Sequence, residues 1–423
     1  MFRLLLFLFF VSGLQYAFPQ TPVPALTSTT SKNRQIFYDR LVNQTINKNL
    51  NLTLSDSTED RWEDAFYALE LLGKRNDAID EKIKYAVVNL PQRSTSFQRA
   101  LLELLYTNYQ QLFTKDVMAL YKSIAHPKIF AMCGEYLLAG SKTSSEKNQL
   151  LSIALARTND MKGPLLSQLM YNIRMSGKKT LPPSFHTFLK KDYLRGNSVV
   201  ISFQRKNRNF PGLVMVKDTS GNFVKDSSGN FFSVTQLARS INNLPGYLTN
   251  GNTPEGVFRM DGFDVSKGSM IGPTPNVQMT MPFEYNARHF YRDSTLPDTI
   301  ENIELYKNLL PKNFRNYYPM QQSFFAGLAG RTEIIAHGTT VNPEYYAGLT
   351  YYPLTPTMGC LCTKEIWSGQ NGRRMYSDQQ LFVDAIEKAG GPTGYVIVIN
   401  IDDKQSAVTL KDITPILNLA DQK

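Results

Sequence analysis

A histidine and a cysteine stand in two turn-like segments of the C-terminal half. His337 is followed by Gly338, and further along Cys360 follows Gly359 in a stretch rich in Thr, Gly and Pro. A cysteine that transfers acyl groups attacks as the thiolate, and an imidazole takes its proton. Glycines beside both residues leave room for backbone N–H groups to approach an oxyanion. Because the chain holds only 4 His and 3 Cys, this pattern predicts Cys360 as nucleophile and His337 as general base.

Strand-like segments surround these two residues within a β-rich region at 196–423. Apolar and β-branched runs predict strands at 199–203, 277–281, 332–336 and 395–401, and a helical pattern covers 379–388. The strand at 332–336 leads into His337 and would hold the imidazole. A duplicated Asp-x-Ser-Gly-Asn segment at 218–222 and 226–230 predicts a pair of β-hairpin turns. Its carboxylates are too few to indicate a calcium site.

Residues 33–195 form a region of different character. Apolar residues recur there at helical spacing, as in Trp62, Phe66 and Leu69, and Gly or Pro residues separate the segments. We predict an all-α domain of short helices, arranged either as a solenoid of helical hairpins or as a compact bundle. Such a domain offers an extended surface, so a wall or envelope protein is its expected partner.

The start of the chain resembles an export signal. Arg3 precedes a short apolar run that ends at Ser12-Gly13, which predicts a signal peptide at 1–20, followed by a flexible leader at 21–32. No other segment is apolar and long enough to span a membrane. The net charge is +10, which suits an anionic wall surface, whereas the absence of Lys/Arg-rich runs argues against nucleic acid. We therefore expect an exported protein of the periplasm or cell envelope of a bacterium.

Three ordered segments of residues 196–423 resemble one family. They are Thr-Pro-Glu-Gly-Val-Phe at 253–258, Met-Pro-Phe at 281–283, and the His337 and Cys360 segments described above. In order and spacing they look like the L,D-transpeptidase catalytic domain (YkuD-like), and the resemblance covers a little over half of the chain. It implies an α + β two-domain chain, in which the all-α domain precedes a mainly-β catalytic domain.

The resemblance implies an enzyme of peptidoglycan cross-linking, hence of cell-wall biogenesis and cell shape, that uses no cofactor and no metal. Cys360 would attack a tetrapeptide stem and release D-alanine, while His337 moves the proton. The carbonyl of Gly338 would orient the imidazole, and the Gly359–Cys360 backbone would bind the oxyanion. The donor site would be formed by five further residues: Met281, Phe283, Thr339, Thr357 and Met358.

The sequence also departs from the family pattern. Met358 stands where the family has His, and Cys362 stands where it has Arg; Arg373 or Arg374 would have to replace that cation. These departures leave open a catalytically weak wall-binding or scaffold protein. The sequence also does not separate transfer from an L,D-carboxypeptidase, in which water resolves the thioester.

Three other interpretations of the cysteines remain open. Cys360 would be a buried structural thiol, a metal ligand together with Cys362 and His337, or half of a strained Cys360–Cys362 disulfide. A zinc site of this kind lacks a fourth ligand.

Overall fold

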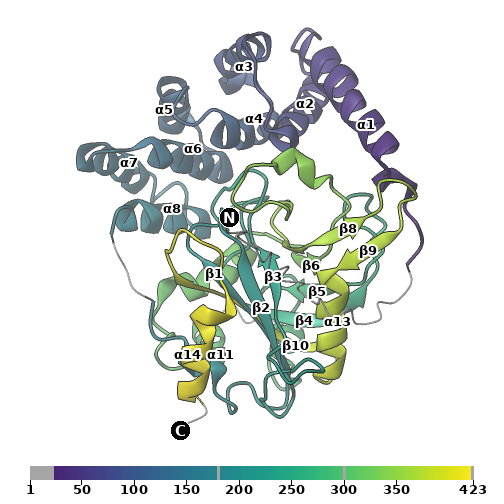
Figure 1. Ribbon diagram of the computed structural model, residues 1–423. Coiled ribbons are helices and arrows are strands. Elements are labelled where there is room, and N and C mark those ends of the chain that lie inside the picture. The colour runs from purple at the N-terminus through teal and green to yellow at the C-terminus, as the bar shows by residue number, and fades with distance from the viewer. Residues whose placement is uncertain (1–22, 179–181, 299–301, 421–423) are drawn as a thin grey trace, which may run out of the picture.

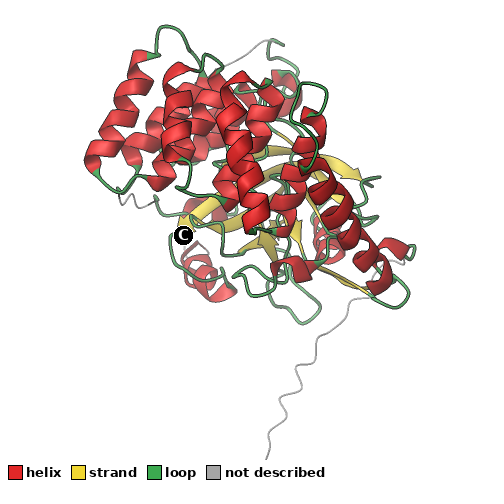
Figure 2. Cartoon of the chain, turned by 90° about the horizontal axis from the view of Figure 1, so that it is seen from above, coloured by secondary structure: helices red, strands yellow, loops and turns green. Residues whose placement is uncertain are grey.

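A computed structural model describes residues 23–178, 182–298 and 302–420 of the chain. The predicted signal peptide at 1–20 lies outside them. Helices dominate the first half: α1 (Ser31–Arg40), α2 (Glu59–Leu72), α3 (Asp77–Asn89), α4 (Thr95–Asn108), α5 (Thr114–Ser123), α6 (Pro127–Gly140), α7 (Ser144–Ala156), α8 (Pro164–Met175) and α9 (His186–Leu189). Figure 1 shows α1 to α8 as a curved layer over one end of the β-rich half, and Figure 2 shows the same layer from above.

The helices stack in an ordered series. Helices α2, α4, α6 and α8 pack on one another in that order, while α5 packs on α6 and α7 on α8. Local signals set their ends: Asn76 and Ser94 cap the starts of α3 and α4, and Thr143 with Glu146 forms a capping box at α7. This successive packing of the inner helices agrees with the solenoid-like arrangement rather than with a compact bundle.

The second half of the chain contains a closed barrel. Its strands are β1 (Ser198–Arg205), β2 (Gly212–Lys217), β3 (Val234–Leu237), β4 (Gly256–Asp264), β5 (Asn276–Thr280), β6 (Ile335–His337), β7 (Leu361–Thr363) and β10 (Thr393–Asp402). They pair in the order β1-β10-β4-β5-β6-β7-β3-β2, and β8 (Glu365–Trp367) with β9 (Arg374–Ser377) makes a separate hairpin. Only β1 with β10 and β6 with β7 are parallel among these pairs.

Two apolar layers stabilise the barrel. Its interior is filled by residues such as Val200, Phe258, Ala336 and Leu361. The outside of β1 and β10 packs against helices of the C-terminal half. The helices of the C-terminal half are α10 (Ala287–Tyr291), α11 (Ile303–Leu309), α12 (Gln322–Leu328), α13 (Asp378–Lys388) and α14 (Leu410–Ala420). Among them α13 instead joins the inner cluster, through Phe382 and Ile386. The prediction of both helices and strands is confirmed, whereas the closure of the strands into a barrel was not predicted.

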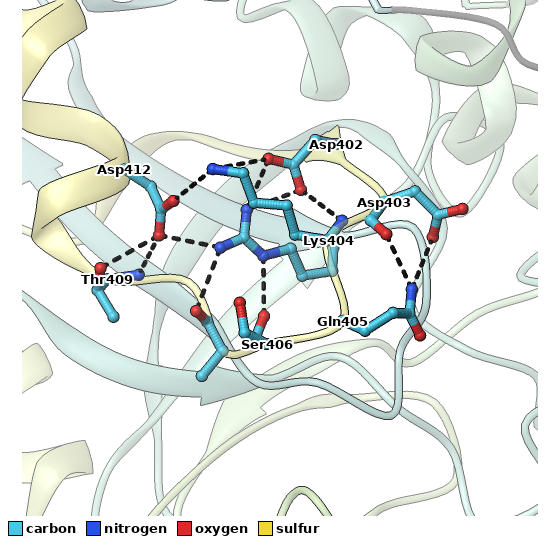
Figure 3. Close-up of polar contacts among 9 residues, drawn as sticks. Asp402, Asp403, Lys404, Gln405, Ser406, Thr409 and Asp412 are labelled. Carbon is cyan, nitrogen blue, oxygen red and sulfur yellow. Dashed lines mark hydrogen bonds and ion pairs between the residues drawn. The ribbon is translucent and has the colours of Figure 1, made fainter.

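A buried arginine fixes the C-terminal helix to the barrel. Arg205, at the end of β1, binds both oxygens of Asp402 at 2.7 and 2.8 Å and Oδ2 of Asp412 at 2.9 Å. Its Nε donates to the carbonyl of Ser406 at 2.9 Å, and Lys404 adds an ion pair to Asp412 at 3.0 Å; Figure 3 shows this network. The network therefore joins β1, β10 and α14.

Several predicted segments are placed differently from expectation. The strand expected at 332–336 begins only at Ile335, because Glu333 has left-handed backbone (φ 62°). The leader expected to be flexible at 21–32 is hydrogen-bonded from Leu26 on: Leu26 N–H donates to Gly372 O and Ser31 N–H to Gly369 O, both at 2.8 Å. The duplicated segments form hairpin turns, with bridges at Lys217–Phe223 and Lys225–Phe231, as predicted.

The boundary predicted at 195/196 does not separate two cores. Ile241, Leu244, Tyr247 and Leu248, from a loop between β3 and β4, belong to the same apolar cluster as the helices α2 to α8. The loop at 241–252 is therefore packed as part of the helical half. In the part of the chain that is described, no helix has the length and apolar character needed to cross a bilayer.

Candidate active site

The backbone register places the predicted base, His337, opposite Cys362, two residues after the predicted nucleophile Cys360. Strands β6 and β7 are parallel neighbours, with Ala336 opposite Leu361 and His337 opposite Cys362. Since side chains alternate along a strand, and Ala336 and Leu361 fill the barrel interior, His337 and Cys362 project to the outside. Cys360 directly precedes β7 and lies two residues before Cys362, the residue opposite His337.

The imidazole of His337 is held in one tautomer. Its Nδ1 lies 2.5 Å from the carbonyl oxygen of Gly338, so Nδ1–H donates and Nε2 keeps its lone pair. Burial lowers the pKa of His337, and the Gly338 carbonyl only partly opposes this. The ring is therefore neutral at pH 7 and can accept a proton at Nε2.

Gly338 is required by its neighbour Glu365. A Cβ at position 338 would collide with the Glu365 carboxyl group. That buried carboxyl accepts a hydrogen bond from Ser377 at 2.7 Å and lies 4.0 Å from Arg374. Next to it, Trp367 Nε1 donates to the carbonyl of Thr339 at 2.8 Å. Contacts from Glu365 and Trp367 thus fix the chain directly after His337.

Cys360 and Cys362 differ in access to solvent. Cys360 is half-buried, and its thiol donates to the carbonyl of Glu333 at 3.7 Å. Cys362 is completely buried 3.8 Å from Thr355 Oγ1, and burial raises its pKa to about 12. Both thiols are free, so the structure contains no Cys360–Cys362 disulfide. The inert structural thiol is Cys362, which leaves Cys360 as the thiol that a substrate can reach.

The Cys360 thiol is protonated at rest. Burial raises its pKa, while the Ile335 N–H and the positive charge of Arg331 act in the opposite direction. With a raised thiol pKa and a lowered imidazole pKa, the resting pair is neutral thiol and neutral imidazole rather than an ion pair. An attack by the Cys360 sulfur would therefore require a base to take its proton in the same step, which is the role predicted for His337.

Thr357 shapes the turn before the nucleophile. Its hydroxyl donates to the Cys360 carbonyl at 2.9 Å and accepts from the Gly359 N–H at 3.0 Å. Gly359 itself has φ +115°, which favours glycine. Because the Gly359 N–H is already bound, it is not the oxyanion donor that the sequence suggested. The Cys360 N–H has no acceptor among the described residues and is the donor that remains.

Arg331 is a cation beside the predicted nucleophile, and the sequence patterns did not point to it. A Cβ on Gly359 would collide with its Nη2. Arg331 is buried and donates to Gly246 O, to Asn252 O at 2.8 Å and to Gly251 O at 2.6 Å. Burial lowers its pKa to about 10, although the Cys360 and Glu284 charges favour the cation. It remains a cation at neutral pH.

Arg373 and Arg374 do not take the place of the family arginine. Arg374 donates to Thr274 Oγ1 at 2.7 Å and to Gln380 Oε1 at 3.3 Å, and it lies 4.0 Å from the Glu365 carboxylate. Arg373 is exposed. The single arginine in Gly330-Arg331-Thr332 carries no periodic or motif signal, so only the fold reveals its position.

The predicted donor-site residues have different surroundings. Met281 is 0 % exposed and packs in the barrel core, so it is not a wall of a substrate site. Thr339 is also buried, and its hydroxyl accepts from Thr355 Oγ1 at 2.9 Å. Phe283 is half-buried against Phe324, with ring centroids 4.9 Å apart, and Met358 is 50 % exposed. Phe283, Thr357 and Met358 thus keep contact with solvent.

Strained backbone surrounds the site. Phe283 and Glu333 have positive φ values of 75° and 62°, which non-glycine residues seldom adopt. Glu284 connects them, because its carboxylate accepts from Met281 N–H at 2.8 Å and from Glu333 N–H at 3.1 Å. Such strain persists where surrounding contacts over-determine the backbone, and it concentrates at functional sites.

Side chains of α4 and α6 form hydrogen bonds with the 246–252 loop, whose carbonyls in turn bind Arg331. Glu103 on α4 accepts from Asn250 Nδ2 at 3.2 Å, and Glu135 on α6 accepts from Tyr247 Oη at 2.7 Å. Lys128 on α6 donates to Thr249 Oγ1 at 2.8 Å. Contacts therefore run from α4 and α6 through the 246–252 loop to Arg331 and Gly359.

No group of three or more His, Cys, Asp or Glu side chains within the described ranges is placed to hold a metal ion. No protein-family model, no curated protein and no solved structure matches the chain. The geometry of the site therefore carries the functional argument together with the sequence motifs.

Proposed function

We propose that the chain is an exported cysteine acyltransferase that acts on peptidoglycan tetrapeptide stems, with residues 196–423 as a YkuD-like L,D-transpeptidase domain. The single observation that carries the proposal is that a half-buried thiol, Cys360, lies two residues before Cys362, the strand partner of His337, whose neutral imidazole is fixed in one tautomer. A scaffold protein has no need for this arrangement. Export to the periplasm or cell envelope follows from the N-terminal sequence pattern.

In the proposed reaction, His337 Nε2 accepts the proton of the Cys360 thiol as sulfur attacks the carbonyl of the third stem residue. The Cys360 N–H donates to the oxyanion, and the nearby charge of Arg331 stabilises both thiolate and oxyanion. As the tetrahedral intermediate collapses, the imidazolium gives its proton to the amine of the leaving D-alanine. A thioester at Cys360 remains.

A second half-reaction completes the transfer. An amine of another stem attacks the thioester, His337 accepts its proton, and the amide forms while the thiol is regenerated. When water attacks instead, the same intermediate gives a shortened stem, which is L,D-carboxypeptidase activity. No metal or organic cofactor takes part in either route.

Intact-mass spectrometry tests the proposal directly. Residues 21–423 are mixed with a disaccharide-tetrapeptide, beside the variants Cys360→Ala and Cys362→Ala. We expect an adduct equal to the stem minus D-alanine in the unaltered chain and in Cys362→Ala, and none in Cys360→Ala. An adduct that is lost only in Cys362→Ala would show that Cys362, and not Cys360, is the nucleophile. No adduct and no free D-alanine, with reduced thiols, would favour the scaffold alternative.

A further inference from the structure

A cavity lies between the first helix and the loop that follows the catalytic histidine. Its volume is about 390 Å³, and it is lined by α1, by Ser269 and Met270, and by residues 340–342 and 345. The N–H of Thr340 donates to the Met270 carbonyl at 3.1 Å, which joins two of these walls. Residues from both halves of the chain thus form one concave surface.

The cavity carries positive charge without a matching carboxylate. Arg34 and Arg40 line it, and no Asp or Glu appears among the described lining residues. Neither arginine forms an ion pair within the described ranges. The charge of Glu344 acts on Arg34 without an ion pair between them, and the Glu344 carboxylate accepts from Tyr352 Oη at 2.9 Å.

Arg34 has unused hydrogen-bonding capacity. Its Nη1 and Nη2 make only long contacts, at 3.5 Å to Asn342 Oδ1 and 3.4 Å to Thr340 O. Its Nε is buried and has no partner among the described residues. A buried donor without an acceptor is costly, and a guanidinium presents a planar fork that fits a carboxylate. Asn33 adds a polar wall, and Phe37 and Tyr345 add aromatic walls.

The cavity is within reach of a substrate bound at the catalytic pair. Gly338 and Thr339 separate His337 from Thr340, so the chain between them spans at most about 10 Å. An extended peptide of four residues spans up to about 13 Å. One stem therefore has the length to contact both the catalytic pair and the cavity.

We propose that the cavity between α1 and the 340–345 segment binds a carboxylate of a peptidoglycan peptide stem, through Arg34 and Arg40. This inference rests on the proposed function, because it takes the stem as the substrate. Asn33 and Asn342 would bond the stem backbone, while Phe37 and Tyr345 contact its apolar parts. The helical half would thereby contribute directly to substrate binding.

Calorimetric titration of disaccharide-tetrapeptide into the Cys360→Ala protein tests the inference, because the readout needs no catalysis. In that background we expect Arg34→Gln with Arg40→Gln to weaken binding by about tenfold or more, since a charge-assisted hydrogen bond is lost at each site. Arg34→Lys with Arg40→Lys keeps the charges and should recover part of the affinity. The matched control is Lys32→Gln, an exposed cation on α1 that does not line the cavity, and it should leave affinity unchanged.

Binding within twofold of the parent in the double Gln variant, with its thermal unfolding unchanged, would overturn the inference. It would also fail if inorganic phosphate, titrated alone, bound the same arginines more tightly than the stem. Failure of this inference is distinguishable from failure of the proposed function. An acyl adduct in the unaltered chain, together with unchanged stem affinity in the double Gln variant, would reject only stem binding in the cavity. Arginine-dependent binding without an adduct rejects only the acyl transfer.

Discussion

Replacing Arg331 by Met should raise the pKa of the Cys360 thiol. The guanidinium lies against Gly359, next to the nucleophile, and its charge favours the thiolate against the effect of burial. Met is unbranched and uncharged, so the variant removes this electrostatic support while filling the space of the aliphatic part of the arginine.

The magnitude follows from Coulomb's law. At an effective dielectric of about 20, a unit charge at about 4–8 Å contributes about 2–4 kcal/mol, equivalent to about 1.5–3 units of thiol pKa. The variant also leaves the carbonyls of Gly246, Gly251 and Asn252 without this donor. Unpartnered buried acceptors cost about 1–3 kcal/mol each, so folding stability should fall by several kcal/mol.

The assay is the rate of Cys360 alkylation by iodoacetamide as a function of pH, read by peptide mass spectrometry. Arg331→Lys is the matched control, because it keeps the charge but loses the planar fork. We expect its thiol pKa to lie between those of Arg331→Met and the unaltered chain. Circular dichroism and thermal unfolding show whether each variant is folded at the assay temperature.

The electrostatic reasoning would be refuted by a folded Arg331→Met protein whose alkylation profile has the same midpoint as the unaltered chain. A profile shifted to lower pH would refute it as well. If Arg331→Met does not fold, Arg331→Lys still tests the anchoring contacts, since it should destabilise the chain less while moving the midpoint little.

Three further predictions concern other contacts. Thr357→Val should slow acyl-enzyme formation by about tenfold or more, because the hydroxyl that orders the Gly359–Cys360 turn is lost; adduct mass against time measures this. Since burial lowers the pKa of His337, its basic form persists to lower pH. The midpoint of the acid limb in a plot of acylation rate against pH should therefore lie below about 6.5, the ordinary pKa of histidine. Although burial opposes it, hydrogen bonds from Thr409 and Lys404 and the charge of Arg205 hold the pKa of Asp412 at about 2. Asp412→Asn should therefore cost about 2 kcal/mol in urea unfolding at pH 7, a difference that shrinks as pH falls from about 4 towards 2.

Each of these has a contrary outcome. An unchanged acylation rate in Thr357→Val, beside the milder Thr357→Ser, would remove the turn from the mechanism. An acid limb above pH 6.5 would mean that the base is more easily protonated than its burial implies. The pKa of Asp412 is lower in the folded state, so its charge stabilises the folded state at pH values above the unfolded-state pKa and no longer does so below the folded-state pKa. A stability difference between Asp412→Asn and the unaltered chain that grows as pH falls would therefore contradict the reasoning.

The sequence singles out His337 and Cys360 because their residue types are rare in this chain and stand beside glycines; their catalytic role stays a prediction. The helices of the first half were predictable for a similar reason, since long segments show a 3.6-residue period. The barrel was not, because β3, β6 and β7 are each four residues or fewer, too short for an alternating pattern. Strand β1 is buried at every position, so it reads as an apolar run and reveals nothing of its neighbours.

The errors at the site have one physical cause. Met281, Thr339 and Gly359 were assigned from a family pattern along the chain, whereas their roles depend on what packs on them. Arg331 depends on a loop at 246–252 that returns from the helical half, and no local sequence feature encodes that return.

The parallel pairing of β6 and β7 has a consequence for how the proposed enzyme would diversify. Strand pairing fixes His337 opposite Cys362, and Cys360 directly precedes β7, so the chain between Thr340 and Pro356 is an excursion whose two ends are fixed. Insertions, deletions or exchanged sequences in that excursion would alter what the enzyme accepts while its reacting atoms keep their places. Libraries aimed at new substrates would best be confined to it.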